Sequence, residues 1–261
     1  SNHGKRVIMD KTELGLTGVQ VTLLSFGSAT NGRRGRSNQG DLGIKKLAYL
    51  LRFAHERGVT FWDTADEYGT HSHVAAALRE VDREKTTLTT KTVSTTPEDV
   101  HRDVERYLRE LGTDYIDILL FHCLTDTRWP EKMQGAMEVL SAFKEEGKIR
   151  AAGVSCHDFG AFETAAETDW VDVVLARINY AGDNMDASPE KVAPVIEKMA
   201  AAGKGIYGMK VLGGGNSLTK DPGKGIRFTC GLAGIHAIVI GMMNEEEILE
   251  NVDLMAEIVP A

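Results

Sequence analysis

Short runs of β-branched and apolar residues alternate with longer helical patterns along most of the chain, and this alternation restricts its possible folds strongly. Eight such runs occur, and a segment with the periodicity of a helix follows each of them. Strands that alternate with helices are typical of βαβ units in a parallel sheet. A chain of 261 residues also matches the size of one closed barrel, about 250 residues. The pattern therefore predicts a single (β/α)₈ barrel domain over residues 1–261.

The individual elements follow from this pattern and from the residues that start and stop helices. The expected strands are residues 21–27, 60–63, 86–92, 115–121, 149–155, 171–178, 205–212 and 236–240. The expected helices are residues 41–57, 73–80, 97–111, 131–146, 159–167, 188–203, 223–230 and 245–258. Thr96 and Asn244 stand where an N-cap side chain accepts a backbone hydrogen bond. Residues 7–19, with a turn near residues 16–18, predict a small β-hairpin ahead of the barrel.

Charge and composition exclude several kinds of partner. The net charge of −8 argues against nucleic acid, because phosphate binding needs a basic face. No apolar run approaches the roughly 18 residues of a membrane-spanning helix, so we expect no membrane insertion. Cys123, Cys156 and Cys230 match no zinc or iron–sulfur spacing, so we expect no metal site.

The cellular location is predicted only indirectly. Sparse cysteines are typical of a reducing compartment, so we expect a cytoplasmic protein. The first six residues are polar and do not resemble a signal peptide. Because the chain does not begin with Met, an exported precursor stays an open alternative. The sequence contains no feature that predicts the oligomeric state.

Four reactive side chains stand at or just after the carboxyl ends of three successive predicted strands. Asp63 ends the second strand, and Tyr68 follows in the next loop. Lys91 ends the third strand and His122 ends the fourth. Active sites of (β/α)₈ barrels lie at this end of the strands. We therefore expect these side chains to meet on one rim.

This set of side chains has a specific chemical use. Reduction of a carbonyl by hydride leaves an alkoxide, and a tyrosine can protonate it if its pKa, ordinarily about 10, is lowered. The Lys91 ammonium is expected to lower that pKa for Tyr68, and Asp63 to hold Lys91 in place and charged. His122 can hydrogen-bond the carbonyl oxygen. Taken singly, Asp63 is more typical of a loop anchor and His122 of a core histidine, but their combination favours catalysis.

Residues 63–69 have the pattern DxAxxYG and resemble the corresponding segment of the aldo-keto reductases. Lys91 and His122 match the other two members of that family's catalytic tetrad, and the resemblance extends over nearly the whole chain. It implies a (β/α)₈ barrel with an N-terminal β-hairpin that reduces an aldehyde or ketone with NADP(H), or with NAD(H). It also implies that Tyr68 is the proton donor, Lys91 its pKa modifier, Asp63 the partner of Lys91, and His122 the group that orients the carbonyl.

The resemblance further implies a dinucleotide site on residues that end or follow the last four strands. Its expected members are Ser155, Cys156, Met209, Lys210, Leu212, Gly213, Gly215, Gly241, Glu247 and Asn251. Some positions depart from the family. Cys156 replaces an asparagine that holds the nicotinamide carboxamide, Leu175 replaces a common glutamine, and Met209 replaces an aromatic that stacks on the nicotinamide. Gly241 and Glu247 stand where relatives carry basic residues for the 2′-phosphate of NADPH, so we expect NADH to be used about as well.

Two other functions stay open. A regulatory or sensor subunit would bind nicotinamide nucleotide with little turnover. The intact tetrad favours an enzyme, whereas the altered carboxamide contacts favour such a sensor. A lyase would instead form a Schiff base on Lys210 or Lys91. For the reductase, the expected partner is a small-molecule carbonyl substrate.

Overall fold

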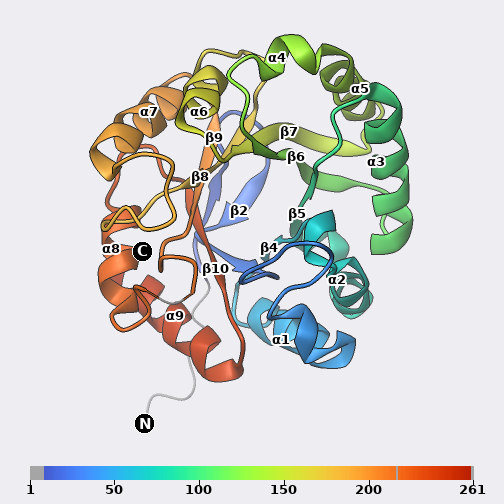
Figure 1. Cartoon of the computed structure of the whole chain (residues 1–261). Coiled ribbons are helices and arrows are strands. Elements are labelled where there is room, and N and C mark those ends of the chain that lie inside the picture. The colour runs from blue at the N-terminus through green and yellow to red at the C-terminus, as the bar shows by residue number, and fades with distance from the viewer. Residues whose placement is uncertain (1–8, 216, 260–261) are drawn as a thin grey trace.

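The computed structural model describes residues 9–215 and 217–259, and a closed barrel of eight parallel strands lies at its centre (Figure 1). Around the barrel the order is β10-β3-β4-β5-β6-β7-β8-β9, so the last strand closes on the first. The strands are β3 Leu24–Gly27, β4 Phe61–Asp63, β5 Thr87–Thr92, β6 Ile116–Leu124, β7 Ile149–Cys156, β8 Val173–Arg177, β9 Gly205–Met209 and β10 Ala237–Gly241. The predicted (β/α)₈ fold is confirmed.

Helices surround the barrel, and a helical interval follows each strand (Figure 1). The α-helices are α1 Ile44–His55, α2 His71–Leu78, α3 Pro97–Leu111, α4 Trp129–Lys132, α5 Gln134–Glu145, α6 Phe159–Ala166, α7 Pro189–Ala201, α8 Pro222–Cys230 and α9 Glu245–Ile258. Short 3-10 helices are η1 Gly40–Leu42, η2 Asp66–Tyr68 and η3 Arg83–Lys85. As predicted, Thr96 caps α3 and Asn244 caps α9 through their side chains. Within residues 9–215 and 217–259, none of the helices has the length and apolarity that a bilayer crossing requires.

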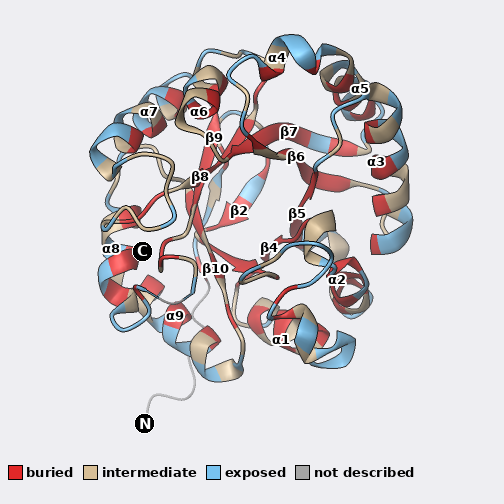
Figure 2. Ribbon diagram, viewed as in Figure 1, coloured by how far each residue is buried: buried red, intermediate tan, exposed pale blue. Residues whose placement is uncertain are grey.

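Two apolar layers hold these elements together, as expected for strands that are buried on both faces. Inside the barrel, Phe61, Ile118 and Tyr207 belong to one buried cluster. Outside it, the strands pack against the inner faces of the helices, which Figure 2 shows in red against pale-blue outer faces. Because the interior is a packed core, a functional site has to lie at a rim of the barrel.

An antiparallel hairpin, β1 Lys11–Glu13 and β2 Gln20–Thr22, precedes the barrel, as predicted. Its second strand contains residues 21 and 22, which we predicted as the start of the first barrel strand, so that boundary is wrong. Val21 pairs with Thr12 across the hairpin, and its side chain packs in the cluster inside the barrel. These apolar residues therefore cover the barrel interior instead of extending a barrel strand. Residues 7–8 of the predicted hairpin lie outside the described residues.

Other boundaries differ from the sequence prediction, and the backbone explains several of them. Gly43, with a φ of 89°, separates η1 from α1, so the helix predicted from residue 41 begins at residue 44. Met133 separates α4 from α5 within one predicted helix. Strand β9 ends at residue 209 because Lys210 adopts a left-handed φ of 63°. Strand β6 continues to Leu124, so His122 lies within it and not at its end.

Candidate active site

Lys91 lies at the centre of a buried polar cluster at the carboxyl end of the strands. Its side chain is fully buried, and its Nζ atom lies 2.6 Å from Asp63 Oδ1. The same ammonium donates to the backbone oxygen of Thr64 at 2.9 Å and to Tyr68 Oη at 3.2 Å. Burial by itself lowers the pKa of Lys91, but Asp63 and Tyr68 raise that pKa above its ordinary value. Lys91 is therefore an ammonium at neutral pH, held between a carboxylate and a phenol.

Asp63 receives a second hydrogen bond from a residue that the sequence did not point to. Tyr207 Oη donates to Asp63 Oδ2 at 2.6 Å, and the Tyr207 side chain is fully buried. In the sequence, an aromatic residue inside a buried strand is typical of core packing. Only closure of the barrel brings β9 within reach of β4. The one available signal was that Tyr207 lies two residues before Met209 and therefore shares its side of the strand.

Tyr68 ends the turn η2 and is half-buried. Gly69 follows with a φ of 67°, and a Cβ at this position would lie 1.9 Å from the carbonyl oxygen of Gly35, so only glycine fits. Burial raises the pKa of Tyr68, and the Lys91 ammonium opposes this rise without reversing it. Our expectation of a lowered pKa is therefore wrong in its net direction. The phenol stays protonated at neutral pH, which is the form a proton donor needs.

His122 faces Tyr68 from β6. The two rings meet edge to face, with their centroids 5.6 Å apart. Burial, together with the charge of Lys91, lowers the pKa of His122 to about 2, so the imidazole is neutral. Its Nδ1 atom is buried without a hydrogen-bond partner among the described residues. A neutral imidazole has one N–H that can donate to an oxygen beside the Tyr68 phenol.

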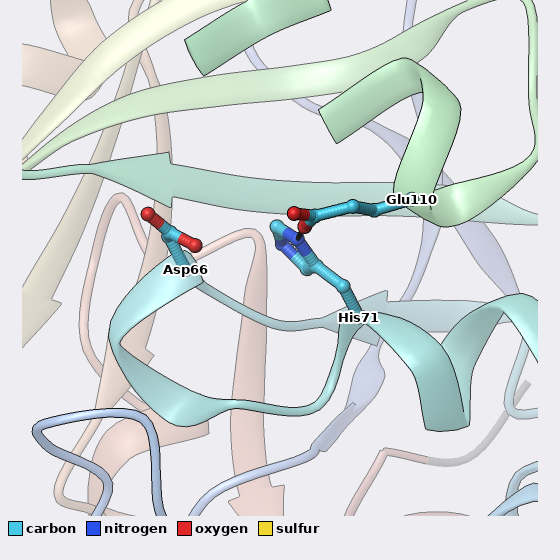
Figure 3. Close-up of side chains that lie close together, drawn as sticks. All are labelled: Asp66, His71 and Glu110. Carbon is cyan, nitrogen blue, oxygen red and sulfur yellow. Dashed lines mark hydrogen bonds and ion pairs between the residues drawn. The ribbon is translucent and has the colours of Figure 1, made fainter. Parts of the chain in front are cut away.

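Asp66 of the turn η2 lies close to His71 of α2 and Glu110 of α3 (Figure 3). Their ligand atoms lie within 4.8 Å of one another, a spacing that can hold a cation. However, Arg106 donates to both oxygens of Asp66, at 2.9 and 2.6 Å, and to Glu110 Oε1 at 2.9 Å. His71 uses both ring nitrogens, toward Glu110 and Thr90, at 2.8 Å each. Because Arg106 already bridges the two carboxylates and both ring nitrogens of His71 have partners, we interpret the cluster as an anchor of η2 against α3.

A cavity of about 280 Å³ opens beside Tyr68 and reaches as far as α9. Asp63 and Tyr68 line it, while Lys91 and His122 contact Tyr68 without forming part of the lining. Among the predicted dinucleotide-binding residues, those in the lining are Met209, Lys210, Leu212, Gly215, Gly241, Glu247 and Asn251.

Ser155, Cys156 and Gly213 are the predicted dinucleotide-binding residues that lie outside this lining. Ser155 Oγ accepts a hydrogen bond from the backbone N–H of Cys123 at 3.0 Å. Cys156 is buried in the layer between strands and helices. The Gly213 carbonyl oxygen accepts a hydrogen bond from Asn184 Nδ2 at 2.8 Å. Each of these three groups is therefore engaged in contacts within the fold and not in the lining of the cavity.

Lys210 is the one cation among the described residues that line the cavity. Burial, and then the nearby charge of Arg177, lowers the pKa of Lys210. Three glycines, residues 213–215, form a turn beside it with φ values of 75°, 87° and 95°. A Cβ at Gly214 would lie 3.5 Å from Lys210 Nζ, so the ammonium lies directly against this turn. A lysine beside a glycine-rich turn is suited to an anionic group.

Arg177 and His157 form a second polar group at the same end of the strands, and neither was predicted from the sequence. Arg177 Nη2 donates to His157 Nε2 at 2.7 Å, and Arg177 Nη1 donates to Asp186 at 3.3 Å. The Sγ atom of Cys123 lies 3.3 Å from His157 Nε2. Burial and Arg177 lower the pKa of His157 to about 4, so this ring is also neutral at pH 7. Their positions at the ends of β7 and β8 were the signal that could have found them.

The model of the aldo/keto reductase family matches residues 23–229. This chain belongs to the aldo/keto reductase family.

Individual proteins resemble the chain at sequence identities of 26% and 32%. Probable aldo-keto reductase 1 of Glycine max is 32% identical over 160 residues, which are 55% of this chain and 44% of the relative. The NADH-specific methylglyoxal reductase of Escherichia coli (strain K12) is 26% identical over 192 residues, 65% of this chain and 59% of the relative. The chain thus spans about half the length of these curated relatives. A solved Pseudomonas aeruginosa structure described as an aldo-keto reductase is similar with a TM-score of 0.79 and 26% identity, over 95% of this chain and 96% of that one.

Proposed function

We propose that this protein is an oxidoreductase that reduces an aldehyde or ketone with hydride from a reduced nicotinamide dinucleotide. The observation that carries the proposal is the position of Tyr68, a protonated phenol in the cavity lining, 3.2 Å from the Lys91 ammonium. A positioned tyrosine can deliver a proton to the oxygen of a carbonyl that accepts hydride. Membership of the aldo/keto reductase family supports the same chemistry.

The residues of the cavity fit a dinucleotide. Lys210 and the glycine turn at residues 213–215 offer positive charge and close backbone approach to a diphosphate. Met209 offers an apolar surface to the nicotinamide ring. A Cβ at Gly241 would lie 2.4 Å from Thr30 Oγ1, so glycine lets the Thr30 side chain pack against the end of β10 in this wall. A reduced dinucleotide bound here would supply the hydride.

The chain's own contribution is to place the carbonyl and to supply the proton. Tyr68 Oη donates a hydrogen bond to the carbonyl oxygen and transfers its proton as that oxygen gains negative charge. The Lys91 ammonium stabilises the phenolate that remains, and Asp63 keeps Lys91 charged and in place. Neutral His122 donates a second hydrogen bond to the carbonyl oxygen and orients it.

The E. coli relative supports a small carbonyl compound as substrate and NADH as a cofactor for this chain. A lyase mechanism on Lys91 is disfavoured, because a buried ammonium with a raised pKa is a poor nucleophile. The lowered pKa of Lys210 favours that residue as the lysine of a lyase. Borohydride trapping in the presence of a carbonyl substrate distinguishes a lyase from a reductase, because only the Schiff base of a lyase is trapped covalently.

The experiment that tests the proposal has two stages. Fluorescence titrations with NADH and with NADPH measure binding, and a panel of aldehydes and ketones that includes methylglyoxal is then monitored by loss of the reduced cofactor. We expect binding and turnover together. Tight binding without turnover of any carbonyl compound would support a sensor and contradict the proposal. Covalent trapping of substrate by borohydride would contradict it in favour of a lyase.

A further inference from the structure

We propose that Tyr207 is a positioning residue for this reaction, whose phenol fixes the Asp63 carboxylate so that Lys91 stays against Tyr68. The inference rests on the proposed function and goes beyond it by adding a member to the catalytic machinery. Tyr207 has no direct contact with Tyr68 among the hydrogen bonds of the described residues, and it acts through Asp63.

The geometry gives Asp63 one donor for each of its oxygens. Lys91 Nζ donates to Oδ1 and Tyr207 Oη donates to Oδ2, both at 2.6 Å. The strands β4 and β9 are separated by β3 and β10 in the barrel order, so the Tyr207 hydrogen bond crosses the barrel interior. The ring of Tyr207 packs against Phe61, with centroids 5.0 Å apart, which holds the phenol at this position.

The Lys91 ammonium depends on the orientation of Asp63. An ammonium has three protons to donate, and Lys91 directs them to Asp63, Thr64 and Tyr68. A carboxylate held by a single donor can rotate about its Cβ–Cγ bond, whereas donors on both oxygens fix its plane. If Asp63 rotates, the first of the three acceptors moves, and Nζ loses its fixed distance to the phenol. Tyr207 prevents that rotation.

A purely structural alternative is that Tyr207 merely satisfies a buried hydroxyl. Both roles predict some loss of stability when the hydroxyl is removed, because Asp63 Oδ2 then lacks a partner. Only the positioning role predicts that removing the Tyr207 hydroxyl lowers turnover because it disturbs Asp63. The experiment therefore compares turnover, its pH dependence and cofactor binding in single and double variants.

The first variant is Tyr207→Phe, which keeps the ring packed against Phe61. We expect kcat to fall about tenfold or more, the scale of one lost hydrogen bond to a charged group. The NADH dissociation constant, measured by fluorescence, stays at the wild-type value. Tyr115→Phe is the matched control, because Tyr115 Oη donates to Arg83 O near the amino end of β6, away from the cavity. We expect wild-type kcat for this control.

The pH profile of kcat is the second readout. Asp63, Tyr207, His122 and Cys123 face the Lys91–Tyr68 pair from β4, β9 and β6. When the Asp63 carboxylate is poorly oriented, it stabilises the protonated form of the Lys91–Tyr68 pair less. The alkaline limb of kcat therefore moves to lower pH in Tyr207→Phe. A core tyrosine without a positioning role leaves the limb in place.

A double-mutant cycle with Asp63→Asn tests the route of action. Because Tyr207 acts through Asp63, we expect Asp63→Asn/Tyr207→Phe to have the same residual turnover as Asp63→Asn alone. Asp63→Asn removes the counter-charge of the buried Lys91 ammonium and is itself expected to be less stable than the wild type, so turnover is compared per folded protein. The folded state of each variant is checked by its thermal transition.

Two results would overturn the inference. One is wild-type kcat and an unmoved alkaline limb in Tyr207→Phe. The other is a further loss of turnover, by the same factor as in the single variant, when Tyr207→Phe is added to Asp63→Asn. A wild-type protein that binds NADH but reduces no carbonyl compound contradicts the proposed function itself, so the two failures are distinguishable.

Discussion

The Nζ atom of Lys91 lies 2.6 Å from the Oδ1 atom of Asp63, and the two side chains are only 0% and 4% exposed. A buried ion pair adds little net stability, because removing both charges from water offsets their attraction. Breaking such a pair is nevertheless destabilising, because it leaves one charge buried without compensation. Stability alone therefore does not explain why this ion pair is buried here. Its contact with Tyr68, the third member of the group, does explain it.

Lys91→Met is expected to abolish carbonyl reduction. The substitution removes the cation beside Tyr68 and leaves Asp63 uncompensated, which costs about 3–5 kcal/mol of folding free energy. The measurements are kcat for an aldehyde and the free energy of unfolding in urea. Lys204→Met is the matched control, since Lys204 is also buried but donates to the backbone oxygens of Thr168 and Val171. Turnover in Lys91→Met at the level of this control would show that the ammonium is not needed.

The pH dependence of reduction is expected to be flat through the neutral range. The pKa values of Tyr68 and Lys91 are both raised, so their protonated forms persist until the pH exceeds about 10. The pKa of His122 is lowered to about 2, so this ring does not titrate near neutrality. We expect constant kcat between about pH 6 and pH 9. A limb with its midpoint in that interval would mean that another group controls the proton.

The barrel could be predicted from the sequence because each strand–helix unit repeats one local pattern of apolar residues. Asp63 and Lys91 could be predicted as neighbours because parallel strands end at one rim. The Tyr207 contact could not be predicted, since it depends on how the closed barrel places β9 across its interior from β4. The direction in which the pKa of Tyr68 shifts was also predicted wrongly, because the balance between burial and the Lys91 charge depends on how deeply the phenol is buried. The start of β3 was misplaced because Val21 and Thr22 of the hairpin run directly into the apolar residues of β3.

NADH is expected to bind about as well as NADPH. Glu247 lines the cavity, and its Oε2 atom accepts a hydrogen bond from the Met243 N–H at 2.7 Å, which holds the carboxylate in place. A carboxylate can accept hydrogen bonds from a free ribose hydroxyl but repels a phosphate. The measurement is a pair of dissociation constants at one ionic strength. NADPH that binds a hundredfold more tightly than NADH, a difference of about 2.7 kcal/mol, would contradict this expectation.

A charge reversal tests the same carboxylate directly. Glu247→Lys is expected to improve NADPH binding relative to NADH by about tenfold, the scale of one charge-assisted hydrogen bond. Glu246→Lys is the matched control, because Glu246 is exposed on the same helix and does not line the cavity. An equal shift in both variants would indicate a general charge effect and not a specific contact.

The hairpin turn offers a test of the fold that is independent of catalysis. Gly15 has a φ of 60°, and a Cβ there would lie 2.4 Å from Gly205 N and 2.5 Å from Gly203 O. Gly18 has a φ of 74° but nothing within 4 Å of such a Cβ. Both alanine variants incur the left-handed strain of about 1–2 kcal/mol, and only Gly15→Ala adds a backbone clash. We expect Gly15→Ala to unfold at lower urea concentration than Gly18→Ala. Equal midpoints would show that the hairpin does not pack against the barrel as described.

Turnover of Tyr68→Phe, measured beside the wild type with saturating NADH and aldehyde, tests whether Tyr68 is the proton donor. The substitution removes only the phenol hydroxyl that lies 3.2 Å from Lys91 Nζ. We expect kcat to fall at least about 10²-fold, the low end for a lost general acid, while the NADH dissociation constant stays unchanged. Wild-type turnover in Tyr68→Phe would show that Tyr68 does not donate the proton, and the mechanism proposed for this protein would be wrong.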